Sequence, residues 1–362
     1  MNLPKNKKET DEPEKESEKS AKFLELSDLK GIGDATVKKL ETAGINTVEA
    51  LAFATENKLE ELGIKKEAAS LIQEARKRLS LGDFITAADL MEQRKNVKML
   101  TTGSKILDAL FKGGYETQSV TEIAGEFACG KSQLCFSASV LVQQPFEQGG
   151  LEGGVLFVDS EDTFKAQRIV EIAKGRGLDP APILEHIIYS PAFNSDHQIF
   201  ILDHADKIIR DNNIKLIVVD SVMAHFRSEY IGREMLGERQ GKLNQHLHQI
   251  LRLARGFNAV ALVTNQVTAN PSGMPYAPQW FATGGNIMGH ANALRIQIRK
   301  AGANKRVATI CDSSWLPWGE RPFLINEKGV DDLPPDEKLA KRYATPTTEN
   351  STPETAESSV PA

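Results

Sequence analysis

The chain has 362 residues with a formal net charge of −5 at pH 7, and 40% of its residues are hydrophobic and 26% charged. Its length allows one core of roughly 200 residues or more beside a smaller domain, and its composition is that of an ordinary soluble protein, without the roughly 18 apolar residues in a row needed to cross a bilayer. The negative charge excludes general attraction to polyanions, so nucleic-acid binding must come from local basic groups, amide nests and helix ends.

Both ends of the chain are predicted to be disordered. Residues 1–22 mix positive and negative charges with almost no apolar side chains, and residues 336–362 are rich in Thr, Pro, Glu and Ser. Neither segment can bury enough surface to offset the loss of chain entropy on folding. We therefore expect two disordered tails around the folded part.

Residues 23–80 are predicted to form a small all-α domain, because apolar residues recur there at helical spacing in short pieces. The segment Leu29-Lys30-Gly31-Ile32-Gly33-Asp34 resembles the turn of a helix-hairpin-helix, which points a helix N-terminus at a DNA phosphate and carries no sequence information. A helical adaptor that binds only protein is the alternative for this domain.

A linker at 81–98 leads into an α/β core predicted at 99–335. Apolar runs rich in Val and Ile, such as VLFVD and LIVVD, alternate with amphipathic helices, one of them expected from Gln198 to Arg210. This alternation is typical of a mostly parallel sheet flanked by helices. The three cysteines, Cys129, Cys135 and Cys311, are too few for a disulfide framework, which favours a reducing, cytoplasmic location.

A phosphate-binding loop is predicted between the strand SVTEIA and the following helix. The segment Gly125-Glu126-Phe127-Ala128-Cys129-Gly130-Lys131-Ser132 fits the pattern GxxxxGK[ST]. Its backbone N–H groups can cradle the phosphates of ATP, while Lys131 reaches the β- and γ-phosphates and Ser132 offers its hydroxyl to Mg²⁺. Gln133 follows directly and is included in the nucleotide site. An ordinary glycine-rich turn is the weaker alternative.

Three further strands place polar side chains at the carboxyl edge of the sheet, where open α/β folds bind ligands. Asp220 ends the buried strand LIVVD, as a metal-binding Walker-B Asp does in P-loop ATPases. Glu161 follows VLFVD and is a candidate base for the water that attacks the γ-phosphate, although a surface Glu capping the next helix would look the same. Gln266 ends AVALVTNQ and could hydrogen-bond the γ-phosphate and change position when it leaves.

The strings GEFACGKSQ, FVDSEDTFKAQRI, PAFNSDHQ, LIVVDS, VTNQV and GGNIMGHA resemble, in this order, the archaeal RadA recombinases and their eukaryotic relatives, a RecA-like DNA strand-exchange family. The resemblance covers residues from about 23 to 333. It implies a RecA-like P-loop ATPase core in which Glu161 is the catalytic glutamate and Gln266 the γ-phosphate sensor. It also implies that Arg168 lies against the adenine, where a planar guanidinium suits stacking.

The same resemblance implies a nucleotide site shared between subunits. The segment from Asp312 to Pro317 resembles the cap that a neighbouring subunit lays over ATP. His290, in GGNIMGHA, resembles the residue that reaches the neighbour's phosphate. The sequence departs from its relatives at Ala128 and Cys129, positions that act through backbone amides. A thiol at a helix N-terminus suggests that Cys129 makes the site sensitive to oxidation.

In the linker, Phe84 and Ala87 match the FxxA motif with which each subunit of these recombinases docks on the next. Outside this family a Phe and an Ala three residues apart would usually signal local packing. An aromatic anchor in a partner's pocket would be worth roughly 2 to 4 kcal/mol.

DNA is expected to be held by two loops and a late hairpin. The first loop, residues 229–240, offers Tyr230, Arg233 and Arg239. The second, residues 267–286, has no Lys or Arg, so it would bind through the backbone N–H groups near Gly284, Gly285 and Asn286 and through apolar wedges between bases, or its aromatic residues would pack on a neighbour. The hairpin residues that resemble a secondary site for incoming duplex, with a solvated basic turn as the alternative, are Arg299, Lys300 and Arg306.

By resemblance, then, the chain is an ATP- and Mg²⁺-dependent recombinase that forms filaments or rings with itself, binds single-stranded DNA at the nucleoid, and exchanges strands with homologous duplex DNA in recombination and repair. Recombination mediators and single-strand binding proteins are further expected partners, and no membrane is. Two alternatives stay open. One is a paralogue or mediator that binds ATP and DNA without exchanging strands, and the other is a ring-forming motor such as a replicative helicase.

Overall fold

The computed structural model describes residues 25–79, 84–269, 280–283, 288 and 293–334. The chain divides into two compact units, Met1–Gly82 and Asp83–Ala362, which are described one at a time. The segments predicted to be disordered, 1–22 and 336–362, lie outside the described residues. Among the described helices, none combines the length and the apolar character that a membrane span requires.

The first unit is all-helical, as predicted. After a 3₁₀ turn at Leu26–Asp28 it contains α1 (Asp34–Thr42), α2 (Val48–Ala52), α3 (Glu56–Glu61) and α4 (Ala68–Arg78). Gly31 has a φ of +89°, which favours glycine, and Gly33 is the N-cap of α1. The helices share one small core, which includes Leu40, Leu51 and Leu59.

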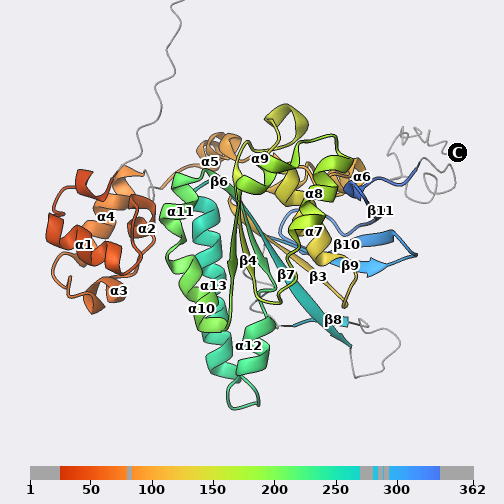
Figure 1. Ribbon diagram of the computed structural model, residues 1–362. Coiled ribbons are helices and arrows are strands. Elements are labelled where there is room, and N and C mark those ends of the chain that lie inside the picture. Colours follow the sequence, from red (N-terminus) through yellow and green to blue (C-terminus); the bar gives the residue numbers. More distant parts are fainter. Residues whose placement is uncertain (1–24, 80–83, 270–279, 284–287, 289–292, 335–362) are drawn as a thin grey trace, which may run out of the picture. The chain divides into compact units, whose positions relative to one another are not determined.

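The second unit is built on a ten-stranded sheet in the order β12-β11-β10-β9-β3-β7-β6-β4-β5, with β8 paired to the end of β7 (Figure 1). The strands from β9 to β5 are parallel, and β10, β11 and β12 continue the sheet in antiparallel pairing. The strands have these bounds: β3 (Ser119–Gly125), β4 (Gly154–Asp159), β5 (Ile187–Pro191), β6 (Ile214–Asp220), β7 (Val260–Ala269), β8 (Trp280–Ala282), β9 (Leu294–Lys300), β10 (Lys305–Ser313), β11 (Glu320–Asn326) and β12 (Gly329–Asp331). A separate pair, β1 (Met99–Leu100) and β2 (Tyr115–Glu116), lies beside it.

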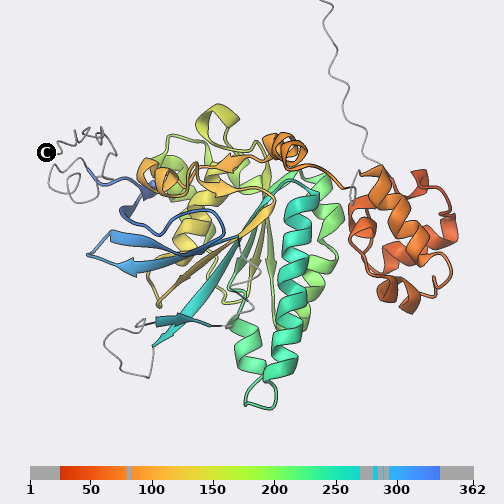
Figure 2. The ribbon, with the colours of Figure 1, turned by 180° about the vertical axis from the view of Figure 1, so that it is seen from behind.

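Helices cover both faces of the sheet, which is why its central strands are largely apolar. On one face lie α7 (Lys131–Leu141), α8 (Ala166–Gly175) and α9 (Pro180–Glu185), and on the other α10 (Ser195–Asp203), α11 (Ala205–Asp211), α12 (Ala224–Glu229) and α13 (Leu236–Gly256) (Figures 1 and 2). Two short helices, α5 (Ala87–Gln93) and α6 (Lys105–Leu110), precede the central strand β3. This confirms the predicted α/β fold class.

One predicted element was wrong in detail. The helix expected from Gln198 to Arg210 is two helices, α10 and α11, which meet at His204. His204 leaves helical geometry, with φ −107° and ψ 9°, and its ring Nδ1 lies 2.9 Å from the carbonyl oxygen of Phe200.

Strand register decides which side chains meet. Gly125 of β3 is aligned with Gln266 of β7, and Asp159 of β4 is aligned with Asp220 of β6. All of these residues stand at the carboxyl ends of parallel strands, so the sequence-predicted polar residues gather at one edge of the sheet.

Candidate nucleotide-binding and catalytic site

The loop between β3 and α7 has a backbone that can cradle an anion. Gly130 has a φ of +112° and is the N-cap of α7, where no side chain caps the helix. A Cβ on Gly125 would lie 2.5 Å from both Cys129 Sγ and the carbonyl oxygen of Ile298, so only glycine fits there. The N–H groups at the start of α7 are thus left for a ligand, and phosphate is the ligand that such a helix end favours.

Lys131 folds back over the same loop. Its Nζ donates hydrogen bonds to the carbonyl oxygens of Gly125 at 3.0 Å and of Glu126 at 2.9 Å. An ammonium group has three N–H donors, so a third remains for a phosphate oxygen. The contacts hold the positive charge above the loop.

Three hydroxyl groups lie close to the carboxylate of Asp220. The Ser132 and Thr264 hydroxyls donate to its carboxylate, and the Thr163 hydroxyl lies 3.3 Å away. Burial raises the pKa of Asp220, and the hydrogen bonds from Ser132 and Thr264 oppose that rise.

The oxygen donors of Ser132 and Asp220 suit Mg²⁺. No cluster of three or more His, Cys, Asp or Glu side chains fit for a metal occurs in the described ranges. Mg²⁺ usually keeps several waters and shares phosphate oxygens, so two protein oxygens are compatible with such a site.

Glu161 and Gln266 meet at the sheet edge. Glu161 Oε1 accepts hydrogen bonds from Gln266 Nε2 at 3.1 Å and from Ser221 Oγ at 2.8 Å. Glu161 follows β4 and Gln266 lies on β7, 105 positions further along the chain, and the structure brings the predicted base and the predicted sensor into direct contact.

Asp159 shapes the turn that presents Glu161. Its carboxylate accepts from the backbone N–H groups of Glu161 at 3.1 Å, Thr163 at 3.3 Å and Phe164 at 2.9 Å. Sequence reasoning assigned no role to Asp159, although it ends its strand with the same pattern as Asp220.

A pocket of about 700 Å³ lies beside Arg168. Arg168 Nε donates to Gln133 Oε1 at 2.8 Å, and Nη1 donates to Glu171 at 2.9 Å. Its Nη2 donates to the carbonyl oxygen of Asn326, so its guanidinium is fixed between α7, α8 and β11. The pocket is lined by Arg168, Glu171, Lys174, Gly175, Asn304, Ile325, Asn326 and Glu327.

The family model described as Rad51 matches residues 93–333. The chain belongs to the Rad51 family. A second model, described as a SAM-like helix-hairpin-helix tandem, matches residues 23–78. A similar relative is the DNA repair and recombination protein RadA of Aeropyrum pernix, which is 44% identical over 317 residues, covering 87% of this chain and 99% of that protein.

Two residues predicted to contact DNA in this Rad51-family chain have other positions. Arg306 Nε donates to the carbonyl oxygen of Cys129 at 2.7 Å, so its guanidinium supports the phosphate-binding loop. Tyr230 is 7% exposed and packs on Phe226, with Lys242 Nζ 5.2 Å from its ring centroid. These contacts lie within the subunit, and the DNA contacts of both residues stay predictions.

Cys129 also differs from its prediction. Its thiol is buried, and burial raises its pKa against the smaller opposing effect of Lys131. A neutral, buried thiol is a poor nucleophile, which argues against an oxidation-sensitive Cys129.

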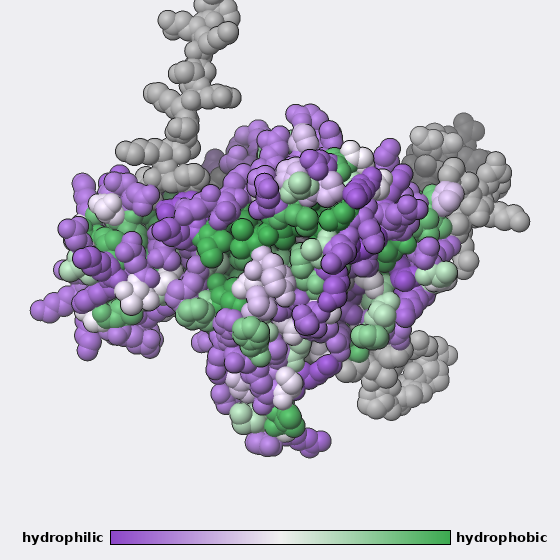
Figure 3. Space-filling model, viewed as in Figure 1, coloured by the Kyte–Doolittle hydropathy of each residue, from purple (hydrophilic) through white to green (hydrophobic). Residues whose placement is uncertain are grey.

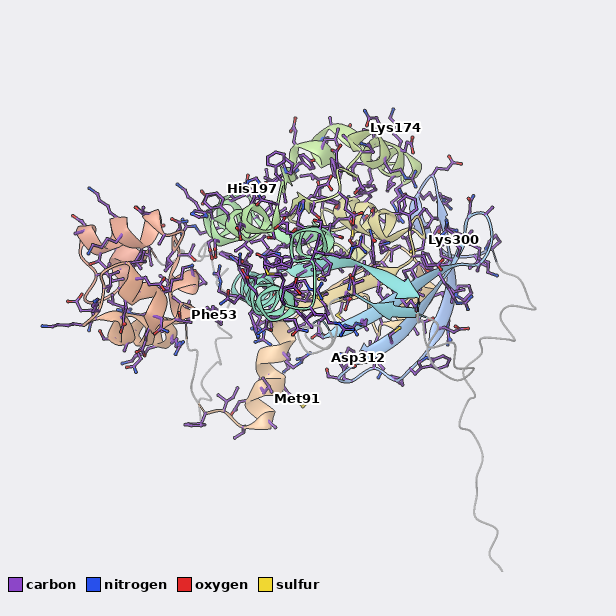
Figure 4. All side chains as sticks on the ribbon, turned by 90° about the horizontal axis from the view of Figure 1, so that it is seen from below. Phe53, Met91, Lys174, His197, Lys300 and Asp312 are labelled. Carbon is purple, nitrogen blue, oxygen red and sulfur yellow. The ribbon has the colours of Figure 1, made fainter. Side chains whose placement is uncertain are left out.

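The remaining predicted DNA contacts are spread over three elements. Arg233 is exposed just before α13, whereas Arg239 lies within α13 and is half-buried. Arg299 forms an ion pair with Glu320 at 3.3 Å, and Lys300, labelled in Figure 4, ends β9 and is exposed. Gly284, Gly285 and Asn286 lie outside the described residues.

The predicted subunit-contact residues are exposed where the structure describes them. Phe84 is fully exposed, and Ala87 opens α5 after the capping box of Thr86 and Asp89. Asp312, on β10 opposite Arg295, and Pro317 are exposed as well (Figure 4). His290 lies outside the described residues.

Proposed function

We propose that this protein is an ATP-dependent recombinase that polymerises on single-stranded DNA and exchanges it with homologous duplex DNA in recombination and repair. Membership of the Rad51 family and the similarity to a DNA repair and recombination protein support this function. The observation that carries the ATP-dependent part is the contact of Glu161 with Gln266 beside the phosphate-binding loop.

The residues at the sheet edge have distinct roles in this proposal. The amides of the loop and Lys131 hold the phosphates, while Arg168 borders the pocket that takes the base. Ser132 and Asp220 would hold Mg²⁺, which when bound neutralises charge on the phosphates. Glu161 takes a proton from the attacking water.

Gln266 links the nucleotide to the catalytic carboxylate. Its amide Nε2 donates to Glu161 Oε1 at 3.1 Å. When the amide turns to a γ-phosphate oxygen, the carboxylate loses one donor, so its oxygen becomes available to orient water. Binding of ATP therefore prepares the base.

Self-association is supported by exposed apolar side chains. Phe84 is exposed in the segment before α5, and the surface near α11 is apolar in Figure 3. Exposed residues on α10, α11 and the segment before them include Phe193, Phe200 and Ile208. An aromatic anchor from one subunit against such a surface would form a homopolymer.

DNA binding in this proposal is largely independent of sequence. The exposed cations Arg233 and Lys300 suit phosphate contacts, and backbone contacts carry no base information. Base pairing between the two DNA molecules then determines which duplex is recognised. Such a protein would work bound to DNA in the cytoplasm.

The first test is ATP hydrolysis with and without single-stranded DNA, in the wild type and in Gln266→Ala. We expect DNA to stimulate the wild type and to lose most of that effect in the variant, which should still bind nucleotide. Gln148→Ala, at an exposed position, is the matched control. If DNA does not change the rate of ATP hydrolysis by the wild type, the proposal is contradicted.

A further inference from the structure

Two serines join the carboxyl ends of β4 and β6, which are neighbours in the sheet (Figure 1). Ser160 Oγ donates a hydrogen bond to the carbonyl oxygen of Ser221 at 2.6 Å and accepts one from the Ser221 N–H at 2.9 Å. The backbone N–H of Ser160 also donates to the carbonyl oxygen of Asp220 at 2.9 Å. These three hydrogen bonds fix the backbone of Ser221 against the segment that follows β4.

The side chain of Ser221 reaches the predicted catalytic base. Ser221 is 1% exposed, and its Oγ donates to Glu161 Oε1 at 2.8 Å. Glu161 itself is half-buried. A hydrogen bond that a carboxylate accepts is stronger than one between two neutral groups, and exclusion of water strengthens it further. The hydroxyl of Ser221 therefore restrains the direction in which the carboxylate of Glu161 points.

The turn that carries Glu161 does not aim its carboxylate. The carboxylate of Asp159 accepts from the backbone N–H of Glu161 at 3.1 Å, which fixes the main chain at this position. A glutamate side chain still has several rotatable bonds, and a base must be aligned with its water for proton transfer to be efficient. The alignment of Glu161 therefore depends on the donors that its carboxylate meets.

Ser221 and Gln266 donate to the same oxygen of Glu161. The Gln266 Nε2 lies 3.1 Å from Oε1, beside the hydroxyl of Ser221. A carboxylate oxygen has about two acceptor sites, so these two donors fill Oε1. In the proposed function, Gln266 turns toward the γ-phosphate and vacates one of the two sites for water. Among the described residues, the hydroxyl of Ser221 is then the side-chain donor that remains on Oε1.

We propose that Ser221 is a positioning residue for ATP hydrolysis, which holds the carboxylate of Glu161 toward the attacking water, and that Ser160 fixes Ser221 for this task. The carboxylate takes one proton from the water, and the water oxygen forms a bond to the γ-phosphorus. The bond from that phosphorus to the bridging oxygen breaks, and its electron pair stays on ADP. Ser221 keeps its own proton throughout. This inference rests on the proposed function, because it assumes that Glu161 is the base.

ATP hydrolysis by the full chain with single-stranded DNA tests this role. Ser221→Ala removes the hydroxyl and leaves the backbone hydrogen bonds with Ser160 in place. We expect kcat to fall about ten- to a hundredfold, the effect of removing a hydrogen bond to a charged group, while KM and the affinity for a non-hydrolysable ATP analogue stay within about twofold. Ser139→Ala is the matched control and should hydrolyse ATP like the wild type. Ser139 is also fully buried, but its hydroxyl donates to the carbonyl oxygen of Cys135 within α7, at 2.8 Å.

A double-mutant cycle with Glu161→Gln distinguishes positioning from a general structural effect. Because Ser221 acts through the carboxylate of Glu161, Ser221→Ala should slow single-turnover hydrolysis by at most about threefold once Glu161 is replaced. A residue that only supports the fold would slow hydrolysis by the same factor in both backgrounds. Equal factors therefore overturn the inference, and so does a Ser221→Ala variant whose kcat equals that of the wild type.

The outcomes also separate this inference from the proposed function. A wild type that hydrolyses no ATP, or normal hydrolysis by Glu161→Gln, contradicts the function itself. If both behave as expected and Ser221→Ala hydrolyses ATP normally, only the inference is overturned. Should Ser221→Ala not fold, Ser160→Ala decides instead, because it releases Ser221 from a half-buried position. We expect that variant to lower kcat about three- to tenfold with unchanged affinity for the analogue, and an unchanged kcat overturns the inference.

Discussion

Arg306 Nε lies 2.7 Å from the carbonyl oxygen of Cys129, and this contact joins β10 to the phosphate-binding loop. The Nη1 of the same guanidinium donates to the carbonyl oxygens of Ala303 at 3.0 Å and Lys305 at 2.9 Å. Arg306 therefore bridges the loop and the turn between β9 and β10. A lysine offers a point charge in place of this planar fork and cannot make the same bridge.

We accordingly expect Arg306→Lys to weaken nucleotide binding about tenfold, the equivalent of about 1.4 kcal/mol. DNA binding without nucleotide should be unchanged. Titration with a fluorescent ATP analogue measures the effect, and Lys328→Met, at an exposed position between β11 and β12, is the control. If Arg306→Lys loses DNA binding and keeps normal nucleotide affinity, Arg306 acts in DNA binding instead.

Glu161→Gln should separate nucleotide binding from hydrolysis. The glutamine keeps the size of the side chain but cannot take a proton, so we expect hydrolysis to fall by about 10² to 10⁴ while the affinity for ATP stays within about twofold. Steady-state phosphate release measures this, with Glu185→Gln as an exposed control. Hydrolysis by Glu161→Gln close to that of the wild type would show that another residue is the base.

Phe84→Ala should abolish filaments without lowering stability. Because Phe84 is fully exposed, its ring has no packing to lose within one subunit, whereas an anchor at an interface is worth roughly 2 to 4 kcal/mol. Electron microscopy with DNA and the ATP analogue, together with thermal unfolding, tests both parts. Phe146→Ala, at another exposed phenylalanine, should form normal filaments. Normal filaments from Phe84→Ala would remove the docking role.

His246 should make the fold sensitive to acid. Burial lowers the pKa of His246 to about 4. Because the folded state disfavours the protonated ring, the stability that it contributes is complete above its unfolded pKa of roughly 6.5 and is lost as pH falls toward 4. We expect the free energy of unfolding to drop by about 2 kcal/mol between pH 7 and about pH 5 from this residue.

Urea unfolding at the two pH values checks this prediction. His246→Gln cannot titrate and should lose less stability on acidification than the wild type. His248→Gln, two residues further along α13 and exposed, should behave like the wild type. Equal pH dependence of wild type and His246→Gln would show that another group dominates.

The sequence predicted the α/β core and the phosphate-binding loop because both depend on local patterns. Apolar runs ending in Asp220 and Gln266 predict parallel strands, and parallel strands bring their carboxyl ends together whatever the distance along the chain. The contact between Glu161 and Gln266 follows from that topology.

What the sequence did not predict depends on contacts between distant segments. Arg306 and Cys129 are 177 positions apart, and nothing local distinguishes an arginine that supports a loop from one that faces solvent. Tyr230 follows an exposed glutamate, yet its ring is buried on Phe226. The helix ends at His204 without a Gly or Pro that would have predicted the break.

Strand exchange between homologous single-stranded and duplex DNA, with ATP and Mg²⁺, tests the central claim most directly. We predict that the wild type exchanges strands without added proteins, that Lys131→Ala does not, and that Lys207→Ala, at an exposed position on α11, behaves like the wild type. A wild type that binds ATP and DNA yet exchanges nothing alone would contradict the recombinase function and favour a mediator.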